Sequence, residues 1–168
     1  MAEIIRAYRQ DMGATRFIGK RYGDGDRVDG MFGALWGEWY ENGWFGAIEE
    51  QLGASSEEAF EDAGAHIGLM REDESGGIEY WIGCFTPEGA TVPEGYQYVD
   101  FARGDLGVCW VCGKESDVFM NEGACVERLA QEGFEISGEW CFERYACPRF
   151  TTPDDKGNVI LDICFFMK

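Results

Sequence analysis

The chain has 168 residues, of which 45% are hydrophobic and 15% aromatic, as expected of one folded globular domain and not of a disordered chain. Its 32 acidic residues outnumber its 14 basic ones, and the net charge of −18 disfavours binding to nucleic-acid phosphates and to anionic membranes. No apolar run approaches the roughly 18 residues of a membrane helix, and the charged start does not fit a secretory signal. We therefore expect a cytoplasmic protein without nucleic-acid or membrane partners.

The first half of the chain predicts strands, then helices, then strands. Apolar side chains recur at helical spacing from about Gly30, and a second helical piece over residues 44–52 follows a break at Asn42 and Gly43. Short runs of β-branched and aromatic residues bounded by polar turns predict the strands. The expected strands of this half cover residues 4–8, 16–21, 65–71 and 78–85.

The same order returns in the second half, after a linker at residues 87–95 that contains Pro87 and Pro93. A helix is expected over residues 116–131, with Gly133 as its end. The expected strands of this half cover residues 97–102, 106–111, 140–147 and 159–167.

This order predicts an α+β fold in which a strand-helix-strand-strand unit occurs twice. The halves fall at about residues 1–86 and 95–168 of a single domain that spans residues 1–168. Two such halves side by side would form an antiparallel sheet with helices on one face. Clefts between repeats often hold small molecules, so we expect a ligand cleft between the halves.

Five segments spread along nearly the whole chain carry a family resemblance: residues 16–20, 32–39, 99–110, 141–145 and 159–163. They resemble the GyrI-like domain, also called the effector-binding domain of AraC- and MerR-type drug-responsive regulators. The resemblance implies the same duplicated fold and a pocket for lipophilic cations. Some stand-alone domains of the family are reported to hydrolyse cyclopropane-bearing DNA-alkylating toxins. The regulators carry a helix-turn-helix ahead of this domain, and its absence here argues against direct transcriptional control.

Glu143 is the main candidate for a pocket residue, and the resemblance places the family's pocket glutamate at this position. Strand alternation puts Cys141, Glu143 and Tyr145 on one face and Arg144 on the other, so Arg144 cannot easily neutralise Glu143. A carboxylate among apolar neighbours either binds a cation or raises its pKa. The alternative is that this face is simply solvated.

Asp162 is the only charged residue in the apolar stretch 159–167. If the last two strands form a hairpin, Asp162 lies within a residue or two of Glu143 in register. Two adjacent carboxylates titrate as a pair, which suits a cation site or acid–base chemistry. The alternative is a carboxylate that only accepts hydrogen bonds near the strand end.

Six tryptophans supply flat surfaces that attract cations and aromatic rings. Trp36 and Trp39 share one side of the first helix, Trp110 ends an apolar strand, and Trp81 shares a strand face with Glu79. With Glu143 they are predicted to line the ligand site. For any one of them, filling the core is the alternative.

Cysteine and histidine do not predict a metal site, and we expect no cofactor. Cys109 and Cys112 form a CxxC pair, but on a strand their side chains point to opposite faces. His66 is the single histidine and is expected to be an ordinary strand residue. The odd number of cysteines indicates reduced thiols. They are Cys84, Cys109, Cys112, Cys125, Cys141, Cys147 and Cys164.

The sequence thus favours a binding module for lipophilic cationic or planar aromatic small molecules. The alternative is a hydrolase of cyclopropane-bearing or other electrophilic xenobiotics, in which Glu143 supplies acid–base chemistry and Tyr145 donates a hydrogen bond. A third possibility is a protein partner in trans, as the namesake of the family is reported to dock onto DNA gyrase. The sequence does not name the ligand.

Overall fold

A computed structural model of the chain describes residues 1–52 and 62–168. Its strands are β1 (Glu3–Met12), β2 (Thr15–Gly23), β3 (His66–Glu72), β4 (Ile78–Pro87), β5 (Gln97–Phe101), β6 (Gly104–Gly113), β7 (Ile136–Tyr145) and β8 (Val159–Met167). Its helices are α1 (Gly33–Asn42), α2 (Trp44–Leu52), α3 (Glu115–Val118) and α4 (Glu122–Gln131), with a short 3₁₀ turn, η1 (Asp24–Asp26). None of the helices in the described ranges is long and apolar enough to cross a membrane.

The helix expected over residues 116–131 is divided into α3 and α4. Met120 has a φ of 62°, which a continuous right-handed helix does not admit. The amide of Asn121 donates to the main-chain oxygens of Asp117, Val118 and Phe119 at 2.9–3.0 Å, and so satisfies carbonyls at the end of α3. The expected single helix is therefore wrong, because a side-chain amide ends the first piece.

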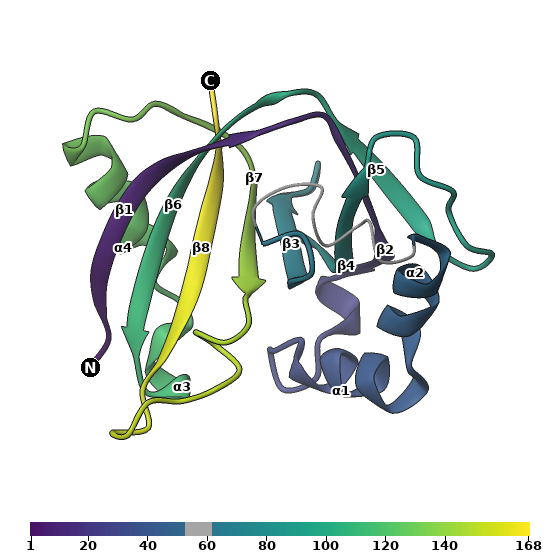
Figure 1. The fold of residues 1–168 in the computed structure, drawn as a ribbon, viewed down its shortest axis with the longest axis horizontal. Helices are drawn as coiled ribbons and strands as arrows, with labels where there is room; N and C mark the ends of the chain where they lie inside the picture. The colour runs from purple at the N-terminus through teal and green to yellow at the C-terminus, as the bar shows by residue number, and fades with distance from the viewer. Residues whose placement is uncertain (53–61) are drawn as a thin grey trace. The chain divides into compact units, whose positions relative to one another are not determined.

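The chain folds into two compact units, which we call unit 1 (Met1–Met12 with Gly104–Lys168) and unit 2 (Gly13–Arg103). In unit 1 the strands lie in the order β1-β6-β8-β7, and in unit 2 in the order β3-β4-β2-β5 (Figure 1). Neighbouring strands within each unit are antiparallel. The expected α+β class is confirmed.

The edge strand of each unit comes from the other half of the sequence. β1 belongs to the half at residues 1–86 but pairs with β6, and β5 belongs to the half at 95–168 but pairs with β2. The compact units therefore differ from the sequence halves by an exchange of first strands. The single domain over residues 1–168 stays a prediction.

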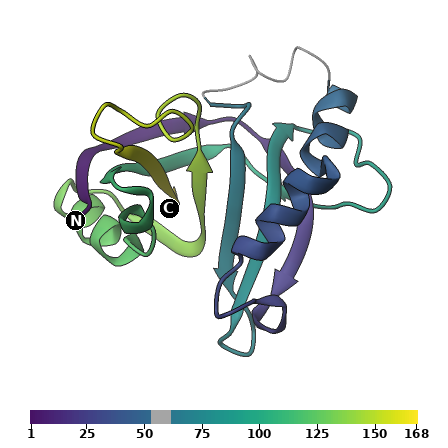
Figure 2. The ribbon, with the colours of Figure 1, turned by 90° about the horizontal axis from the view of Figure 1, so that it is seen from below.

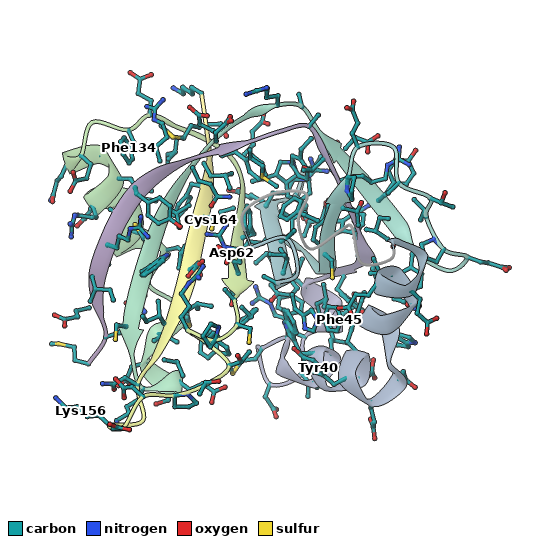
Figure 3. The ribbon with its side chains drawn as sticks, viewed as in Figure 1. Tyr40, Phe45, Asp62, Phe134, Lys156 and Cys164 are labelled. Carbon is teal, nitrogen blue, oxygen red and sulfur yellow. The ribbon has the colours of Figure 1, made fainter. Side chains whose placement is uncertain are left out.

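Helices cover one face of each sheet, here called the helix face; the other is the far face. In unit 1, alternate β8 residues from Val159 to Phe165 pack against Val118 of α3 and against Cys125 and Leu129 of α4. Cys164, labelled on β8 in Figure 3, belongs to the far face by alternation. In unit 2, α1 and α2 lie over one face of the strands (Figure 2). Tyr80 and Ile82 of β4 pack in the core with Trp39 of α1, so Glu79 and Trp81, which alternate with them, lie on the far face.

Two glycines allow β2 and β4 to approach closely at the centre of unit 2. Gly19 lies opposite Gly83 in the register. A Cβ at Gly83 would lie 2.1 Å from the Ile18 oxygen and 2.7 Å from the Gly19 Cα, both main-chain atoms. Because main chain within a sheet cannot swing aside as a side chain can, the strand pair has no room for a methyl group here.

Replacing Gly83 with alanine should therefore lower the free energy of unfolding by about 2–3 kcal/mol through overpacking. Gly37→Ala is the matched control, since Gly37 lies within α1 with nothing within 4 Å of its built Cβ. That change should raise stability by about 0.5–1 kcal/mol, because alanine is the better helix former. Urea unfolding measures both, and equal shifts in the two variants would contradict the close approach.

Candidate functional site

Asp162 is held by two arginines on the far face of unit 1. Its side chain is 0% exposed. Arg144 Nε donates to Oδ2 at 2.7 Å and Arg149 Nε donates to Oδ1 at 2.8 Å, with a second contact from Arg149 Nη2 to Oδ2. Arg144 also donates to Gln10 Oε1 at 2.8 Å. The carboxylate is therefore fully neutralised by side chains of its own unit.

Glu143 and Asp162 lie on opposite faces of the sheet. The expected hairpin is present, but its register pairs Arg144 with Asp162 and Glu143 with Ile163. A shift of one residue reverses the face to which a side chain points. The predicted coupling of the two carboxylates is therefore wrong. Asp162 instead pairs with Arg144, which lies on the face opposite Glu143.

Trp110 lies beside this ion pair on the far face of unit 1. It is opposite Asp162 in the β6–β8 register, and the Arg149 guanidinium lies 4.7 Å from its ring centroid. Tyr8 meets the ring edge-on at 6.1 Å. Trp110 and Asp162, both predicted as site residues, are thus brought together, but with cationic neighbours and not as an acidic wall.

The far face of unit 2 repeats this arrangement around Glu79. The Glu79 side chain is 4% exposed and accepts a hydrogen bond from Trp81 Nε1 at 2.8 Å. Arg71 Nε and Arg21 Nη2 each lie 3.2 Å from a carboxylate oxygen. Glu79 and Trp81 therefore lie on one strand face, as expected, and are also hydrogen-bonded. Two arginines again satisfy the carboxylate, so it does not wait for an external cation.

Sequence reasoning missed these arginines. Arg71 and Arg144 are each next to last in their strands and face the buried acid of the neighbouring strand. The sequence of β7 did hold one signal. Strand alternation places Arg144 on the face opposite Glu143, and an arginine on a largely apolar strand face is expected to pair with an acid on the neighbouring strand. Arg21 and Arg149 come from other segments, and local patterns do not reveal them.

Trp36 and Trp39 lie on the helix face of unit 2. Trp39 is fully buried and donates to the Tyr22 hydroxyl at 3.0 Å, while Trp36 donates to the Tyr80 hydroxyl at 2.9 Å. Along β4, Tyr80 alternates with Glu79 and Trp81, so the structure does not bring these two tryptophans together with the Glu79 pair. Both belong to the core under α1 and α2.

Further aromatic rings extend this core. Tyr40 and Phe45, labelled in Figure 3, have centroids 5.3 Å apart. His66 is the first residue of β3, so the expectation that it lies in a strand is met. Its ring stacks on Phe45 with a centroid separation of 3.7 Å. Burial lowers the pKa of His66. The histidine therefore has a packing role that explains its presence.

Glu143 belongs to an acidic aromatic cluster on the helix face of unit 1, which we call the Glu143 cluster. The Glu143 residue is 9% exposed and accepts a hydrogen bond from the Tyr145 hydroxyl. The Tyr145 ring meets Phe150 edge-on at 4.7 Å and lies 6.4 Å from Phe119. Burial, together with the negative charges of Glu122 and Glu143, raises the pKa of Cys141 to about 12. The cluster consists of Phe119, Cys141, Glu143, Tyr145 and Phe150.

The cysteines do not gather around a metal. Cys109 packs in the helix-face core of unit 1, whereas Cys112, three residues on along β6, is partly exposed. Within residues 1–52 and 62–168 there is no group of three or more His, Cys, Asp or Glu side chains placed to hold a metal ion.

Solved structures share the fold of this chain. SAV2435 bound to tetraphenylphosphonium is 16% identical, with a TM-score of 0.67 over 98% of this chain and 94% of that one. The C-terminal domain of EcmrR is 10% identical, with a TM-score of 0.53 over 97% of each chain. A hydrolase encoded by lin2189 from Listeria innocua is 13% identical, with a TM-score of 0.54 over 97% of this chain and 92% of that one. Comparison with protein-family models gives no match, and neither does comparison with curated proteins.

Removing the charge of Asp162 should be costly, because Asp162 is 0% exposed and binds both Arg144 and Arg149. We expect Asp162→Asn to lower the free energy of unfolding by about 3–5 kcal/mol. Asp105→Asn is the control: Asp105 pairs with Arg9 at 3.0 Å, but at the surface, and should cost less than about 1 kcal/mol. Urea or thermal unfolding compares them, and similar losses would show that the buried pair is not special.

Proposed function

We propose that the chain is a binding module for small aromatic molecules that carry a positive charge, with Glu143 as the counter-ion. The observation that carries this proposal is the burial of a carboxylate within an aromatic cluster. Tyr145 donates a hydrogen bond from its neutral hydroxyl to that carboxylate. Asp162 and Glu79 are each held by two guanidinium groups and are therefore poorer candidates for the counter-ion.

The energetics favour a lipophilic cation over a small inorganic one. A charge in a poorly hydrated site is stabilised by an opposite charge far more than it would be in water. Aromatic rings add cation–π attraction and cover apolar parts of a ligand. The net charge of −18 draws cations toward the protein at long range.

Two of the structural neighbours support this assignment. SAV2435 has been captured with tetraphenylphosphonium, which is a cation surrounded by four phenyl rings. The C-terminal domain of EcmrR has the same fold, and the sequence resembles effector-binding domains of drug-responsive regulators. A role as a sensor or sequestering protein for xenobiotic cations is consistent with both.

Tetraphenylphosphonium is the probe for this proposal. Calorimetry should give micromolar affinity for the wild type and a loss of about tenfold to a hundredfold in Glu143→Gln, the scale of one partly buried charge partner, about 1–3 kcal/mol. Neutral triphenylphosphine oxide should bind both proteins alike. Glu139→Gln removes a charge from an exposed position of the same strand and should change affinity less than twofold.

If Glu143→Gln binds tetraphenylphosphonium as tightly as the wild type, Glu143 is not the counter-ion. If Glu139→Gln weakens binding to the same extent, the effect is one of overall charge and the site lies elsewhere.

A hydrolase is the second candidate, and the contact between Glu143 and Tyr145 is what favours it. To open a cyclopropane conjugated to a carbonyl, the oxygen of water attacks a ring carbon while the carboxylate accepts a proton from that water. The ring C–C bond breaks, its electron pair moves to the carbonyl side as an enol, and the tyrosine hydroxyl donates the proton taken up there. A structural neighbour that bears the name hydrolase has the same fold.

Labelled water distinguishes the two candidates. Incubation with a cyclopropane-bearing alkylating indole in ¹⁸O water should give many labelled products per protein if the chain is a catalyst. Glu143→Gln and Tyr145→Phe should each then lower the turnover rate at least a hundredfold, while Glu139→Gln keeps it. Stoichiometric binding or a single alkylation without labelled product would leave the binding module alone.

A further inference from the structure

His66 also connects Tyr40 and Glu49 in one chain of hydrogen bonds in unit 2. Its Nδ1 lies 3.0 Å from the Tyr40 hydroxyl, and its Nε2 lies 3.3 Å from Oε1 of Glu49. The three side chains come from three elements, since Tyr40 belongs to α1, Glu49 to α2 and His66 to the start of β3. The fold of unit 2 therefore brings a phenol, an imidazole and a carboxylate into direct contact.

One neutral form of the imidazole satisfies both contacts. An ionised carboxylate can only accept a hydrogen bond, so Nε2 carries the ring proton and donates to Glu49. Nδ1 then has a lone pair and accepts a hydrogen bond from the Tyr40 hydroxyl. Burial lowers the pKa of His66, which keeps the ring neutral at pH 7. The tyrosine hydroxyl is thus hydrogen-bonded to a base.

Aromatic packing holds the imidazole in this orientation. The His66 ring stacks on Phe45 with an angle of 3° between the ring planes. Tyr40, labelled beside Phe45 in Figure 3, is 58% exposed and so can meet a molecule from solution. A hydroxyl, a base that can take its proton and a third group that orients the base are the parts of an activated nucleophile.

Tyr40 does not react as a ready-made phenolate. Partial burial of the ring raises the pKa of Tyr40, so the hydroxyl stays protonated at neutral pH. It becomes a nucleophile only as His66 takes its proton during the attack, which is general-base catalysis. Cys84 of β4 lies near Tyr40, but burial raises the pKa of this thiol and keeps it uncharged. Glu49 therefore supplies the negative charge that stabilises the imidazolium.

We propose that Tyr40 is a nucleophile that takes an acyl group from activated esters, with His66 as its general base and Glu49 as the residue that positions the base. The Tyr40 oxygen attacks the carbonyl carbon of the ester while its proton passes to Nδ1 of His66. The bond from that carbon to the leaving oxygen then breaks, and the leaving oxygen takes the proton from His66. Water, giving its proton to His66, attacks the acyl-tyrosine, and Tyr40 regains its proton as the free acid leaves.

The chemistry of a phenol determines the class of acyl donor. The pKa of a tyrosine hydroxyl is about 10, which is far below that of an alcohol. Transfer from an alkyl ester to tyrosine is therefore uphill, whereas transfer from an aryl ester with an electron-withdrawing ring is downhill. Such an ester also needs no strong acid to assist its leaving group. The site shares no residue with the Glu143 cluster, so it is a second activity and does not depend on cation binding.

p-Nitrophenyl acetate is the probe, and peptide mass spectrometry locates the acetyl group. Tyr98 is the matched tyrosine, because it is 50% exposed and its ring lies under Arg16, whose guanidinium is not a base. Brief treatment near neutral pH should acetylate Tyr40 at least about tenfold faster than Tyr98. Neutral hydroxylamine should remove the acetyl group from Tyr40, because it cleaves phenol esters and spares the amides formed on lysine.

Two substitutions separate the base from the packing of its ring. His66→Gln can still accept from Tyr40 and donate to Glu49, but an amide is not a base at neutral pH. It should slow acetylation of Tyr40 at least about tenfold and leave the rate at Tyr98 unchanged. Tyr40→Phe keeps the ring and should remove the hydroxylamine-sensitive acetyl group. The ratio of Tyr40 to Tyr98 in the wild type tests the proposal even if a variant folds poorly.

The pH profile tests the role of Glu49. Acetylation of Tyr40 needs neutral His66, so its rate is full above the pKa of His66 and falls as the pH drops below it. Burial lowers that pKa, and Glu49 opposes the shift through its hydrogen bond and charge. Glu49→Gln should therefore move the fall to lower pH and reduce the maximal rate about threefold to tenfold. Glu50→Gln, at the next and exposed position of α2, should change neither.

Three results would overturn this second activity. The first is acetylation of Tyr40 no faster than that of Tyr98. The second is a His66→Gln variant that acetylates Tyr40 at the wild-type rate, which would leave His66 with packing alone. The third is a Glu49→Gln variant with the rate and pH profile of Glu50→Gln, which would remove the positioning role of Glu49.

Discussion

The pairing of a buried acid with two arginines organises the far face of each unit. In unit 1 the Asp162 carboxylate ties the last two strands together and connects, through Arg144, to Gln10 of β1. In unit 2 Glu79 does the same between β4, β3 and β2. Burying a charged side chain costs solvation free energy, and an ion pair offsets that cost only when its geometry is good. The positions of these acids and arginines are therefore constrained. They tie neighbouring strands together in one register.

That constraint separates the chemistry of the two faces of unit 1. The far face buries Asp162 with Arg144 and Arg149, whereas Glu143 lies on the helix face and accepts a hydrogen bond from Tyr145. The sheet lies between these two carboxylates, so they do not form one site.

Local patterns predicted most strands and helices, because period-2 and period-3.6 repeats are properties of neighbouring residues. They also predicted the last hairpin and the shared strand face of Glu79 and Trp81. They failed where a shift of one residue in strand register changes the sheet face on which a side chain lies, as for Glu143 and Asp162. They could not show that Trp36 and Trp39 point into the core, since that depends on which sheet face the helices cover. Contacts such as Arg144 with Gln10, 134 residues apart, leave no local trace.

The exchange of first strands bears on how such a chain could arise. β1 completes the sheet that contains β6, and β5 completes the sheet that contains β2. One half of the sequence on its own would leave β2 or β6 with a bare edge, which tends to recruit another strand. Two copies of a half could satisfy each other by trading their first strands, as in a domain-swapped dimer. The present chain has the topology of such a dimer joined by a linker. A gene duplication could therefore produce this fold even if a single half were not stable as a monomer.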